Sequence, residues 1–556
     1  MAQNANQDLP VEELRQREEE ELAQVLSQKY GIRYRDLTRE SINTDALRLI
    51  PEETARIVEA AAFEIVGKKL SLAVRSPQHK NLPQVLADLE HKGYIVEQSM
   101  VSKISLERAW DHYKDLSFAT ESKEGVLDVS AKALKEAAAN IHTIEDVQKS
   151  IEDVSEMKRA YRISKILEVV LAGAFSIEAS DIHIEPEEKD TKMRYRLDGV
   201  LHDVARFDTE THGLLVSRLK LLSGLKLNIK DRPQDGRYSV TLDEKQIEIR
   251  TSVIPGAYGE TVVMRLLDPA TISVPFEALG MEPRLKELID REIHNPNGML
   301  LNTGPTGSGK TTTLYACLKK LYSSEVKIIT IEDPIEYHVQ GIVQTQVDDK
   351  NYTFLQGLRS ALRQDPDIIM IGEIRDEEVA RTAIDAALTG HFVFSTIHTN
   401  NAAGTFPRLV DLGIDPKVFS SAINITMAQR LVRRLCDKCK KQVPLDEKYK
   451  ARVEKILAGL RDKSALPKDT SHIYTAVGCA DCNGTGYKGR IGVFEAIVVD
   501  EEMDKLLRTS PSEREIQNVQ SKRDLLMMPE DGVLKAFSGM TSLDEVDRVV
   551  LIEQDS

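Results

Sequence analysis

The sequence has no long apolar run and little cysteine, and both scarcities limit what the protein can be. No window approaches the roughly 18 consecutive apolar residues that a membrane-spanning helix needs, and the N-terminal stretch MAQNANQDLPVEELRQREEEEL has no apolar signal core. We therefore expect a cytoplasmic protein that reaches a membrane only through partners. The formal net charge of −15 argues against a bulk nucleic-acid binder.

A chain of 556 residues exceeds what one hydrophobic core usually organises, so we expect several domains, and shifts in composition predict seven segments. They are an acidic, flexible segment at 1–26, a small α/β domain at 27–113, a polar linker with helical pieces at 114–158, a second α/β domain at 159–275, a core of alternating strands and helices at 276–435, a cysteine module at 436–490 and a helical tail at 491–556.

The core segment contains a complete phosphate-binding loop. Residues Gly304 to Thr311 read GPTGSGKT and match G-x-x-x-x-G-K-[ST], with an apolar strand before them and a helical TTTLYACLKKLY after them. The glycines allow backbone N–H groups to turn toward phosphate, and the start of the helix adds its positive end. We expect Lys310 to reach the β- and γ-phosphate oxygens and the Thr311 hydroxyl to take a Mg²⁺ position. The pattern predicts an ATPase.

Acidic residues follow two further strands of the core segment. Glu373 ends the apolar strand of DIIMIGEIRD, at the carboxyl end where α/β sheets bind ligands, and can hold the water shell of Mg²⁺ or orient the attacking water. After VKIITI come Glu332, Asp333 and Glu336, and Pro334 keeps them in a strand-end loop. Hydrolysis needs a group that orients or deprotonates water, and from the residues alone any of these three acids could do so.

Two histidines bracket the strand in HFVFSTIHT. His391 and His398 are seven residues apart, so on a regular strand they would point to opposite faces and could not both meet the nucleotide. His398 is at the carboxyl end, and we place it near the γ-phosphate.

Four of the five cysteines form two Cys-x-x-Cys pairs, Cys436 with Cys439 and Cys479 with Cys482. Each pair can present two thiolates from one tight turn, and two such turns predict a structural tetrahedral Zn²⁺ site without an open position for catalysis. The alternative is a pair of turns whose cysteines only pack. Cys317 is expected to be a small buried side chain.

Taken together, GPTGSGKTTTLYA, ITIEDPIEY, LRQDPDIIMIGEIRD and ALTGHFVFSTIHTNNAAG resemble, in order and spacing, the motif set of the ATPases of type II secretion and type IV pilus systems. ASDIHIEP, RYRLDG, RPQDGR, QRLVRRLC and the cysteine segments are also similar to that family. The resemblance covers residues 27 to 550. It implies a RecA-like P-loop ATPase domain, a preceding PAS-like α/β domain, a small N-terminal α/β domain and a tetracysteine zinc module.

The resemblance also implies a site. Glu336 would activate water, Glu373 would act through the Mg²⁺ shell and His398 would sense the γ-phosphate. Arginines from the preceding domain would complete the site, with surface ion pairs as the alternative reading; the candidates are Arg237, Arg250 and Arg265. ATP and Mg²⁺ would contact Gly304, Thr306, Gly307, Ser308, Gly309, Lys310, Thr311 and Thr312.

The resemblance implies a hexameric motor at the cytoplasmic face of the inner membrane. It would feed pilin subunits into a type IV pilus through a membrane platform protein, and the wording GYKGRIGVFE leans toward this branch. A type II secretion ATPase is the close alternative, and a DNA-uptake or regulatory ATPase is a third reading that the acidic composition disfavours. The segment before YGIRYRDL has no Arg-Leu-Gly type signature for nucleotide binding. Residues 27–113 are therefore expected to dock a membrane partner rather than bind a cyclic dinucleotide.

Overall fold

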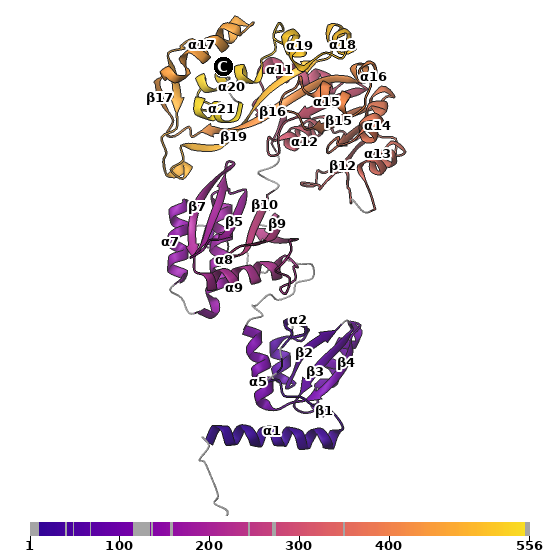
Figure 1. The fold of residues 1–556 in the computed structure, drawn as a ribbon, viewed down its shortest axis with the longest axis vertical. Helices are drawn as coiled ribbons and strands as arrows, with labels where there is room; N and C mark the ends of the chain where they lie inside the picture. The colour runs from indigo at the N-terminus through magenta and orange to yellow at the C-terminus, as the bar shows by residue number, and fades with distance from the viewer. Residues whose placement is uncertain are drawn as a thin grey trace, which may run out of the picture. The chain divides into compact units, whose positions relative to one another are not determined.

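The computed structural model describes residues 11–38, 40, 42–47, 49–66, 68–114, 134, 137–138, 140–155, 159–242, 245–268, 274–348 and 351–550 (Figure 1). The contacts divide the chain into two compact units, Met1–Asp128 with Glu156–Lys165 and Val129–Ser155 with Ile166–Ser556. No helix in the described ranges is long and apolar enough to cross a membrane.

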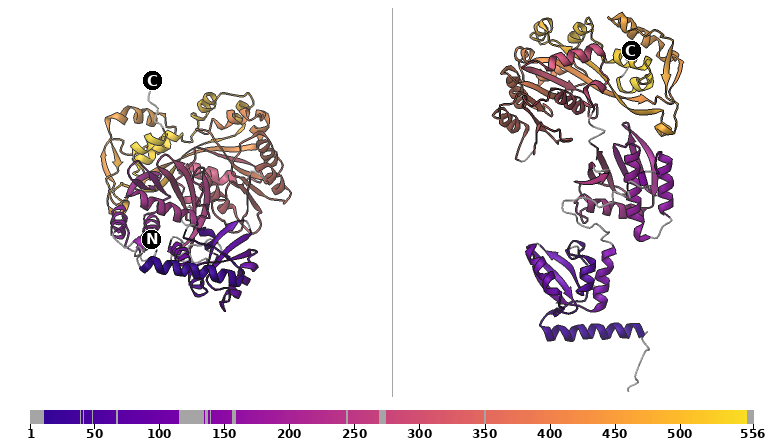
Figure 2. Two further views of the ribbon diagram at one scale, coloured as in Figure 1. Left: turned by 60° about the horizontal axis from the view of Figure 1, so that its bottom comes forward. Right: turned by 180° about the vertical axis from the view of Figure 1, so that it is seen from behind.

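The first unit has a four-stranded sheet in the order β1-β4-β3-β2 with helices around it (Figures 1 and 2). Its elements are α1 (Val11–Tyr30), β1 (Arg33–Tyr34), α2 (Thr44–Leu47), α3 (Glu52–Ile57), β2 (Ala60–Val66), β3 (Lys69–Val74), α4 (Leu82–His91), β4 (Ile95–Met100) and α5 (Lys103–Asp111).

Helix α1 contains residues 11–26 of the segment 1–26 that is predicted to be flexible, and residues 1–10 lie outside the described residues. Its second half packs on the unit, because Ala23 is buried and the Ser102 hydroxyl donates to the Glu20 carboxylate over 2.6 Å. The sparse apolar positions are enough because one face of the helix needs only a few small side chains against the sheet.

The second unit begins with an antiparallel six-stranded sheet in the order β7-β6-β5-β10-β9-β8. Along β6 (Thr191–Leu197) buried and half-buried side chains alternate, as expected for a sheet with one face on a core. The other elements are α7 (Ile144–Ser155), α8 (Arg159–Ser176), β5 (Asp181–Pro186), β7 (Val200–Phe207), α9 (Thr209–Leu222), β8 (Gln234–Leu242), β9 (Lys245–Gly256) and β10 (Gly259–Leu267).

A seven-stranded sheet follows in the order β13-β12-β14-β15-β11-β16-β19, parallel except for the last pair. Strands β11 (Gly298–Thr303), β12 (Ile328–Glu332), β14 (Ile368–Ile371) and β15 (Phe392–Ile397) are buried along their whole length, because helices cover both faces. The remaining strands are β13 (Val343–Gln346), β16 (Ile423–Leu435) and β19 (Tyr487–Val498).

Two hydrophobic clusters lie on the two faces of this sheet. Met299 and Leu301 join the cluster that contains α14 (Glu377–Leu388), whereas Leu300 and Phe394 join the cluster that contains α12 (Lys310–Leu321). Successive side chains of a strand point to opposite faces, so one apolar run serves both clusters. The other helices around the sheet are α11 (Pro283–Ile293), α13 (Phe354–Leu362), α15 (Thr405–Asp411) and α16 (Pro416–Ala422).

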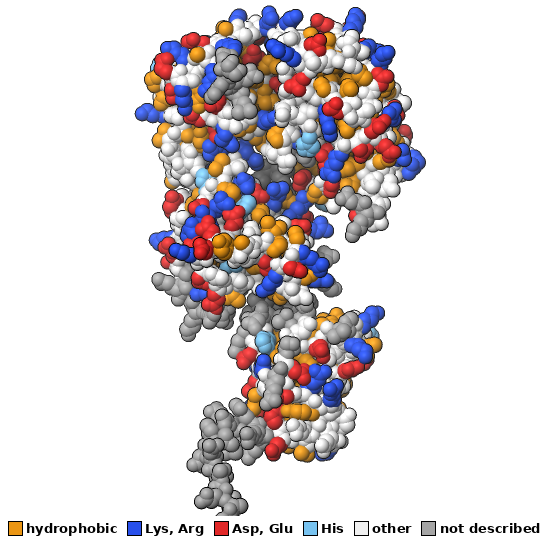
Figure 3. Space-filling view, viewed as in Figure 1, with side chains coloured by type: hydrophobic (Ala, Val, Ile, Leu, Met, Phe, Trp, Pro, Cys, Tyr) orange, Lys and Arg blue, Asp and Glu red, His pale blue; other side chains and the backbone are white. Residues whose placement is uncertain are grey.

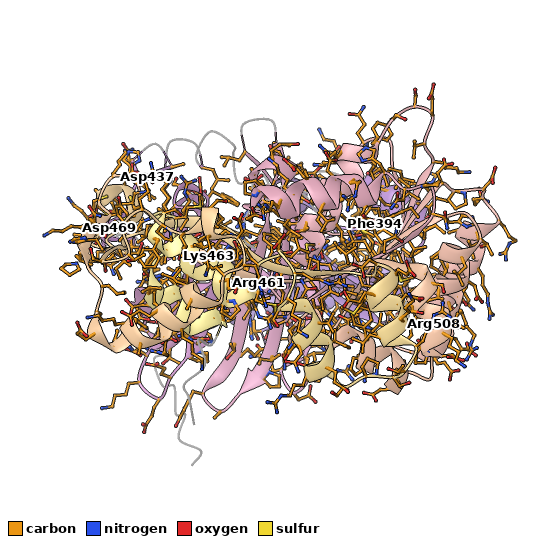
Figure 4. All side chains as sticks on the ribbon, turned by 90° about the horizontal axis from the view of Figure 1, so that it is seen from above. Phe394, Asp437, Arg461, Lys463, Asp469 and Arg508 are labelled. Carbon is orange, nitrogen blue, oxygen red and sulfur yellow. The ribbon has the colours of Figure 1, made fainter. Side chains whose placement is uncertain are left out.

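The cysteine segment is inserted between β16 and β19. It contains β17 (Lys441–Pro444), α17 (Glu447–Gly459) and β18 (His472–Thr475), and Figure 4 shows Asp437 and Asp469 at one end of the molecule, away from Phe394 and Arg508. The prediction of a helical tail from residue 491 is wrong for 491–498, which lie in β19. A short apolar run has no period that separates strand from helix, and pairing with β16 decides it. The helices after it are α18 (Glu501–Leu507), α19 (Glu513–Gln520), α20 (Met528–Phe537) and α21 (Leu543–Val550).

Candidate active site

The phosphate-binding loop connects β11 to the start of α12. Gly304, Gly307 and Gly309 have φ angles of 144°, 78° and 88°, which L side chains rarely adopt. A Cβ on Gly304 would also lie 2.5 Å from the Gln429 carbonyl oxygen. The loop therefore requires glycine at 304 both for its conformation and for its close approach to β16.

In the described structure the loop closes on its own lysine. Lys310 Nζ donates to the carbonyl oxygens of Gly304 and Pro305 over 2.7 and 3.1 Å, and burial lowers the pKa of Lys310. The Ser308 hydroxyl is buried and has no hydrogen-bond partner among the described residues. A loop with turned N–H groups, a cation and an unsatisfied hydroxyl fits phosphate and its Mg²⁺. Thr311 and Thr312 are half-buried on the first turn of α12, and Thr306 is exposed in the loop.

Glu373 follows β14 and contacts the side chains of Arg375 and His398. Its carboxylate accepts from Arg375 Nε over 2.6 Å and lies 3.1 Å from His398 Nε2. Burial alone would raise the pKa of Glu373, but the bonds and charges of Arg375 and His398 outweigh it and hold the pKa below its ordinary value. Glu373 is thus ionised at neutral pH, as a group acting beside Mg²⁺ must be.

The two histidines lie at opposite ends of β15. His398 follows the carboxyl end of the strand, with 54% of its side chain exposed. His391 precedes the strand, and its Nδ1 lies 3.1 Å from the Ala386 carbonyl oxygen. Of the two histidines, only His398 is near the acids. It is there because it follows the carboxyl end of β15, and not because of the face of the strand from which it points.

The three acids after β12 occupy different surroundings. Glu332 is 2% exposed and accepts hydrogen bonds from Tyr315, Thr330 and Gln344, so it cannot meet a water at the surface. Asp333 pairs with Arg375 over 3.4 Å. Glu336 has 35% of its side chain exposed. Of the three, Glu336 combines access to solvent with freedom from the Arg375 cluster.

The three candidate arginines form a row across the six-stranded sheet. Arg237 is opposite Arg250, which is opposite Arg265 on β10, so all three share one face. Arg250 Nη1 donates to Glu336 over 3.2 Å, and Arg265 Nε donates to Asp181 over 3.0 Å. Arg237 is exposed. The structure brings only Arg250 to the acids of the core.

Sequence reasoning missed two residues of β16 that lie against the phosphate loop. Gln429 Oε1 accepts from Asn302 Nδ2 over 3.2 Å and from the Thr313 hydroxyl over 2.8 Å. Arg430 Nη2 donates to the Asn400 carbonyl over 2.5 Å, beside the His398 turn, and burial lowers the pKa of Arg430. The sequence signals were a polar pair, Gln-Arg, in the middle of a mostly buried strand, and the likeness of QRLVRRLC to the family, which assigned no role to either residue.

The four predicted cysteines come together. Their Sγ atoms all lie within 4.8 Å of one another, and neighbouring pairs are 3.7 to 3.9 Å apart. Zn–S bonds of about 2.3 Å in a tetrahedron give an S···S edge of about 3.8 Å. Backbone N–H groups of Gly478 and Gly486 donate to Cys439 and Cys482. The donor set and spacing fit one Zn²⁺, and Cys317 is buried elsewhere.

Known proteins share both sequence and fold with this chain. Residues 156–548 match the family described as "Type II/IV secretion system protein". The chain is 44% identical to the type II secretion system protein E of Pseudomonas aeruginosa over 72% of this chain and 77% of that one. It is 36% identical to the type IV pilus assembly ATPase PilB of Myxococcus xanthus over 95% of this chain and 91% of that one. The X-ray structure of the ATPase DotB of Legionella pneumophila matches with a TM-score of 0.50 at 22% identity, covering 69% of this chain and 94% of DotB.

Proposed function

The chain belongs to the type II/IV secretion system protein family, and on this premise we propose that it is a hexameric motor that uses ATP hydrolysis to assemble pilin subunits into a type IV pilus. The observation that carries the pilus branch is the likeness to a type IV pilus assembly ATPase along nearly the whole of both chains. The membership supports ATP hydrolysis, because relatives of this chain are ATPases by name.

The catalytic roles follow from the placement of the side chains. The backbone N–H groups of 306–309 hold the phosphates, and Lys310 leaves its loop carbonyls for the β- and γ-phosphate oxygens. Thr311 would hold Mg²⁺, with Glu373 contacting its water shell, and bound Mg²⁺ neutralises charge on the transferred group. Glu336 orients and deprotonates the attacking water, and His398 reports the γ-phosphate to Glu373.

Arg250, with Arg265 and Arg237 beside it in the row, completes the site by meeting charge that develops on the phosphoryl oxygens. These residues come from the six-stranded domain, which we propose is PAS-like, and the phosphate loop comes from a RecA-like core. Relative movement of the two sheets then alters the site, which is the link from hydrolysis to mechanical work.

The remaining parts support assembly. Cys436, Cys439, Cys479 and Cys482 would hold a structural Zn²⁺, and the first unit would dock an inner-membrane platform protein, giving peripheral association at the cytoplasmic face. Over the elements of the seven-stranded sheet, acidic and basic side chains are interspersed on the face shown in Figure 3, which gives no support to a role on nucleic acid.

A type II secretion ATPase is the second candidate, favoured by the higher identity to type II secretion system protein E over a shorter stretch. The two are separated by deleting the chain in its own organism and counting surface filaments and secreted proteins. Loss of filaments with normal secretion supports pilus assembly, and the reverse result supports secretion.

Hydrolysis is tested with the purified full chain. Lys310→Ala should abolish ATP hydrolysis and weaken nucleotide binding, whereas Glu336→Gln should bind ATP normally and hydrolyse it at least about a hundredfold more slowly. Full activity of either variant would remove the proposed site.

A further inference from the structure

A buried polar cluster lies beneath the loop that carries Glu336. Tyr315 comes from α12, Glu332 and Thr330 from β12, and Gln344 from the edge strand β13. Tyr315 and Thr330 are fully buried and Glu332 is 2% exposed. A carboxylate with so little access to water is costly unless its lone pairs are satisfied, so the cluster must serve a purpose that an apolar core would not.

Glu332 is the acceptor at the centre of the cluster. The Tyr315 and Thr330 hydroxyls and the Gln344 amide all donate to its carboxylate, the last over 3.2 Å. Gln344 Nε2 also faces the Tyr315 phenol oxygen at 3.2 Å. Three donors point at one side chain, and an amide in its place would direct two N–H donors at groups that already donate.

The cluster holds the backbone that follows Glu336. The Tyr337 carbonyl accepts from Gln344 Nε2 over 3.1 Å. The Tyr315 and Tyr337 rings meet edge to face, with centroids 4.8 Å apart. Gln344 Oε1 further accepts from the Val339 N–H over 2.8 Å.

Tyr315 also connects this loop to the phosphate site. It lies one helical turn after Thr311 on α12, the helix whose first residue is Lys310. A single side chain therefore relates the helix that carries the phosphate-binding groups to the residue that meets water. Effective hydrolysis needs the phosphate-binding groups and Glu336 to be correctly placed relative to each other. A displacement of about 1 Å can lower the rate about a hundredfold.

We propose that Tyr315 and Glu332 are positioning residues that hold Glu336 in register with the phosphate loop, through the hydroxyl–carboxylate contact and through Gln344, which binds the backbone of Tyr337 and Val339. The inference rests on the proposed role of Glu336. Neither residue touches the nucleotide, so each affects turnover and not nucleotide binding.

Tyr315→Phe tests this with the full-length protein, since it removes one hydroxyl and keeps the ring packing on Tyr337. We expect kcat to fall about tenfold while KM for ATP stays within about twofold. The matched control is Tyr195→Phe, because Tyr195 on β6 of the six-stranded sheet is equally buried and its hydroxyl donates to the Val170 carbonyl of α8. It should lower the melting temperature to a similar extent and leave kcat unchanged.

A double-mutant cycle separates positioning from general destabilisation. If Tyr315 acts through Glu336, Tyr315→Phe in a Glu336→Gln background should cause no further loss of kcat. Glu332→Gln should reproduce the split between kcat and KM. An undiminished kcat in Tyr315→Phe, or a full additional tenfold loss in the double variant, overturns the inference. If the proposed role of Glu336 is itself wrong, the result is different: Glu336→Gln alone hydrolyses ATP at the normal rate.

Discussion

Arg250 and Glu336 are 86 positions apart in the sequence, yet Arg250 Nη1 lies 3.2 Å from the Glu336 carboxylate and Nη2 donates to the neighbouring Ile335 carbonyl over 2.7 Å. The guanidinium thus donates hydrogen bonds to both a side chain and the backbone of one loop. It joins the six-stranded sheet to the proposed water-activating residue.

Removal of the Arg250 guanidinium should slow hydrolysis. We expect Arg250→Ala to lower kcat at least about tenfold, and Arg250→Lys to fall between it and the wild type, because an ammonium cannot bridge two acceptors as a planar fork does. Steady-state ATPase kinetics provide the measurement. Arg206→Ala is the control, since Arg206 is half exposed and, among the described residues, its ion pairs are with Glu187 and Asp190 in the turn between β5 and β6. Wild-type turnover by Arg250→Ala would contradict the proposed role.

Metal analysis should find about one Zn²⁺ per chain. The Cys436→Ser, Cys479→Ser double variant should lose the metal and melt at a lower temperature, because the remaining two thiolates cannot close a tetrahedral site. Cys317→Ala should keep the metal, as Cys317 is buried outside the cluster. Elemental analysis measures the metal content of each variant. A metal-free wild type that melts at the same temperature as the double variant would refute the zinc site.

Acid should loosen the attachment of α21. Burial would raise the pKa of Glu545, but the bonds from Arg433 and Arg548 outweigh it and lower the pKa from 4.5 to about 2. The folded state therefore holds this carboxylate ionised more firmly than the unfolded state does. Its contribution to stability is complete above the unfolded value and is lost as the pH falls from 4.5 toward 2.

Denaturant unfolding of the wild type and Glu545→Gln at several pH values measures this contribution. The difference in unfolding free energy between them should be largest near neutrality and shrink across that acid window. A difference that stays constant with pH would show that the Glu545 charge is not what holds the helix.

Two glycines of the phosphate loop should tolerate alanine differently. Both have positive φ angles, which cost an alanine about 1 kcal/mol, but a Cβ on Gly307 has nothing within 4 Å whereas one on Gly304 meets the Gln429 carbonyl. Gly304→Ala should therefore lower the melting temperature clearly more than Gly307→Ala. Equal melting temperatures would mean that the loop moves freely away from β16.

Local patterns predicted the parts of the site that are contiguous in the sequence. The apolar strand predicted before the phosphate loop is β11, Gly298–Thr303, and the helix predicted after it is α12, which begins at Lys310. The geometry of this loop can be predicted from the motif alone, because its glycines, its lysine and the following helix are consecutive in the sequence. The cysteine cluster was also predictable, since the chemistry of four thiolates requires that two distant turns meet.

Long-range pairing could not be predicted in the same way. The arginine row depends on the register of β8, β9 and β10, and the place of Gln429 depends on β16 lying beside β11. Neither leaves a periodic signal in one sequence. Burial also decides between the three acids after β12, and composition alone does not reveal which of them points into the core. The catalytic roles stay predictions until the variants above are measured.

The antiparallel ribbon of β16 and β19 has a mechanical consequence. Gln429 stands against the phosphate loop, and Leu435, six residues further along the same strand, precedes the first zinc-binding cysteine. Six residues of strand span roughly 20 Å. Each degree of tilt of this strand about Gln429 would therefore move the cysteine end by about 0.3 Å, scaled from the same strand rise.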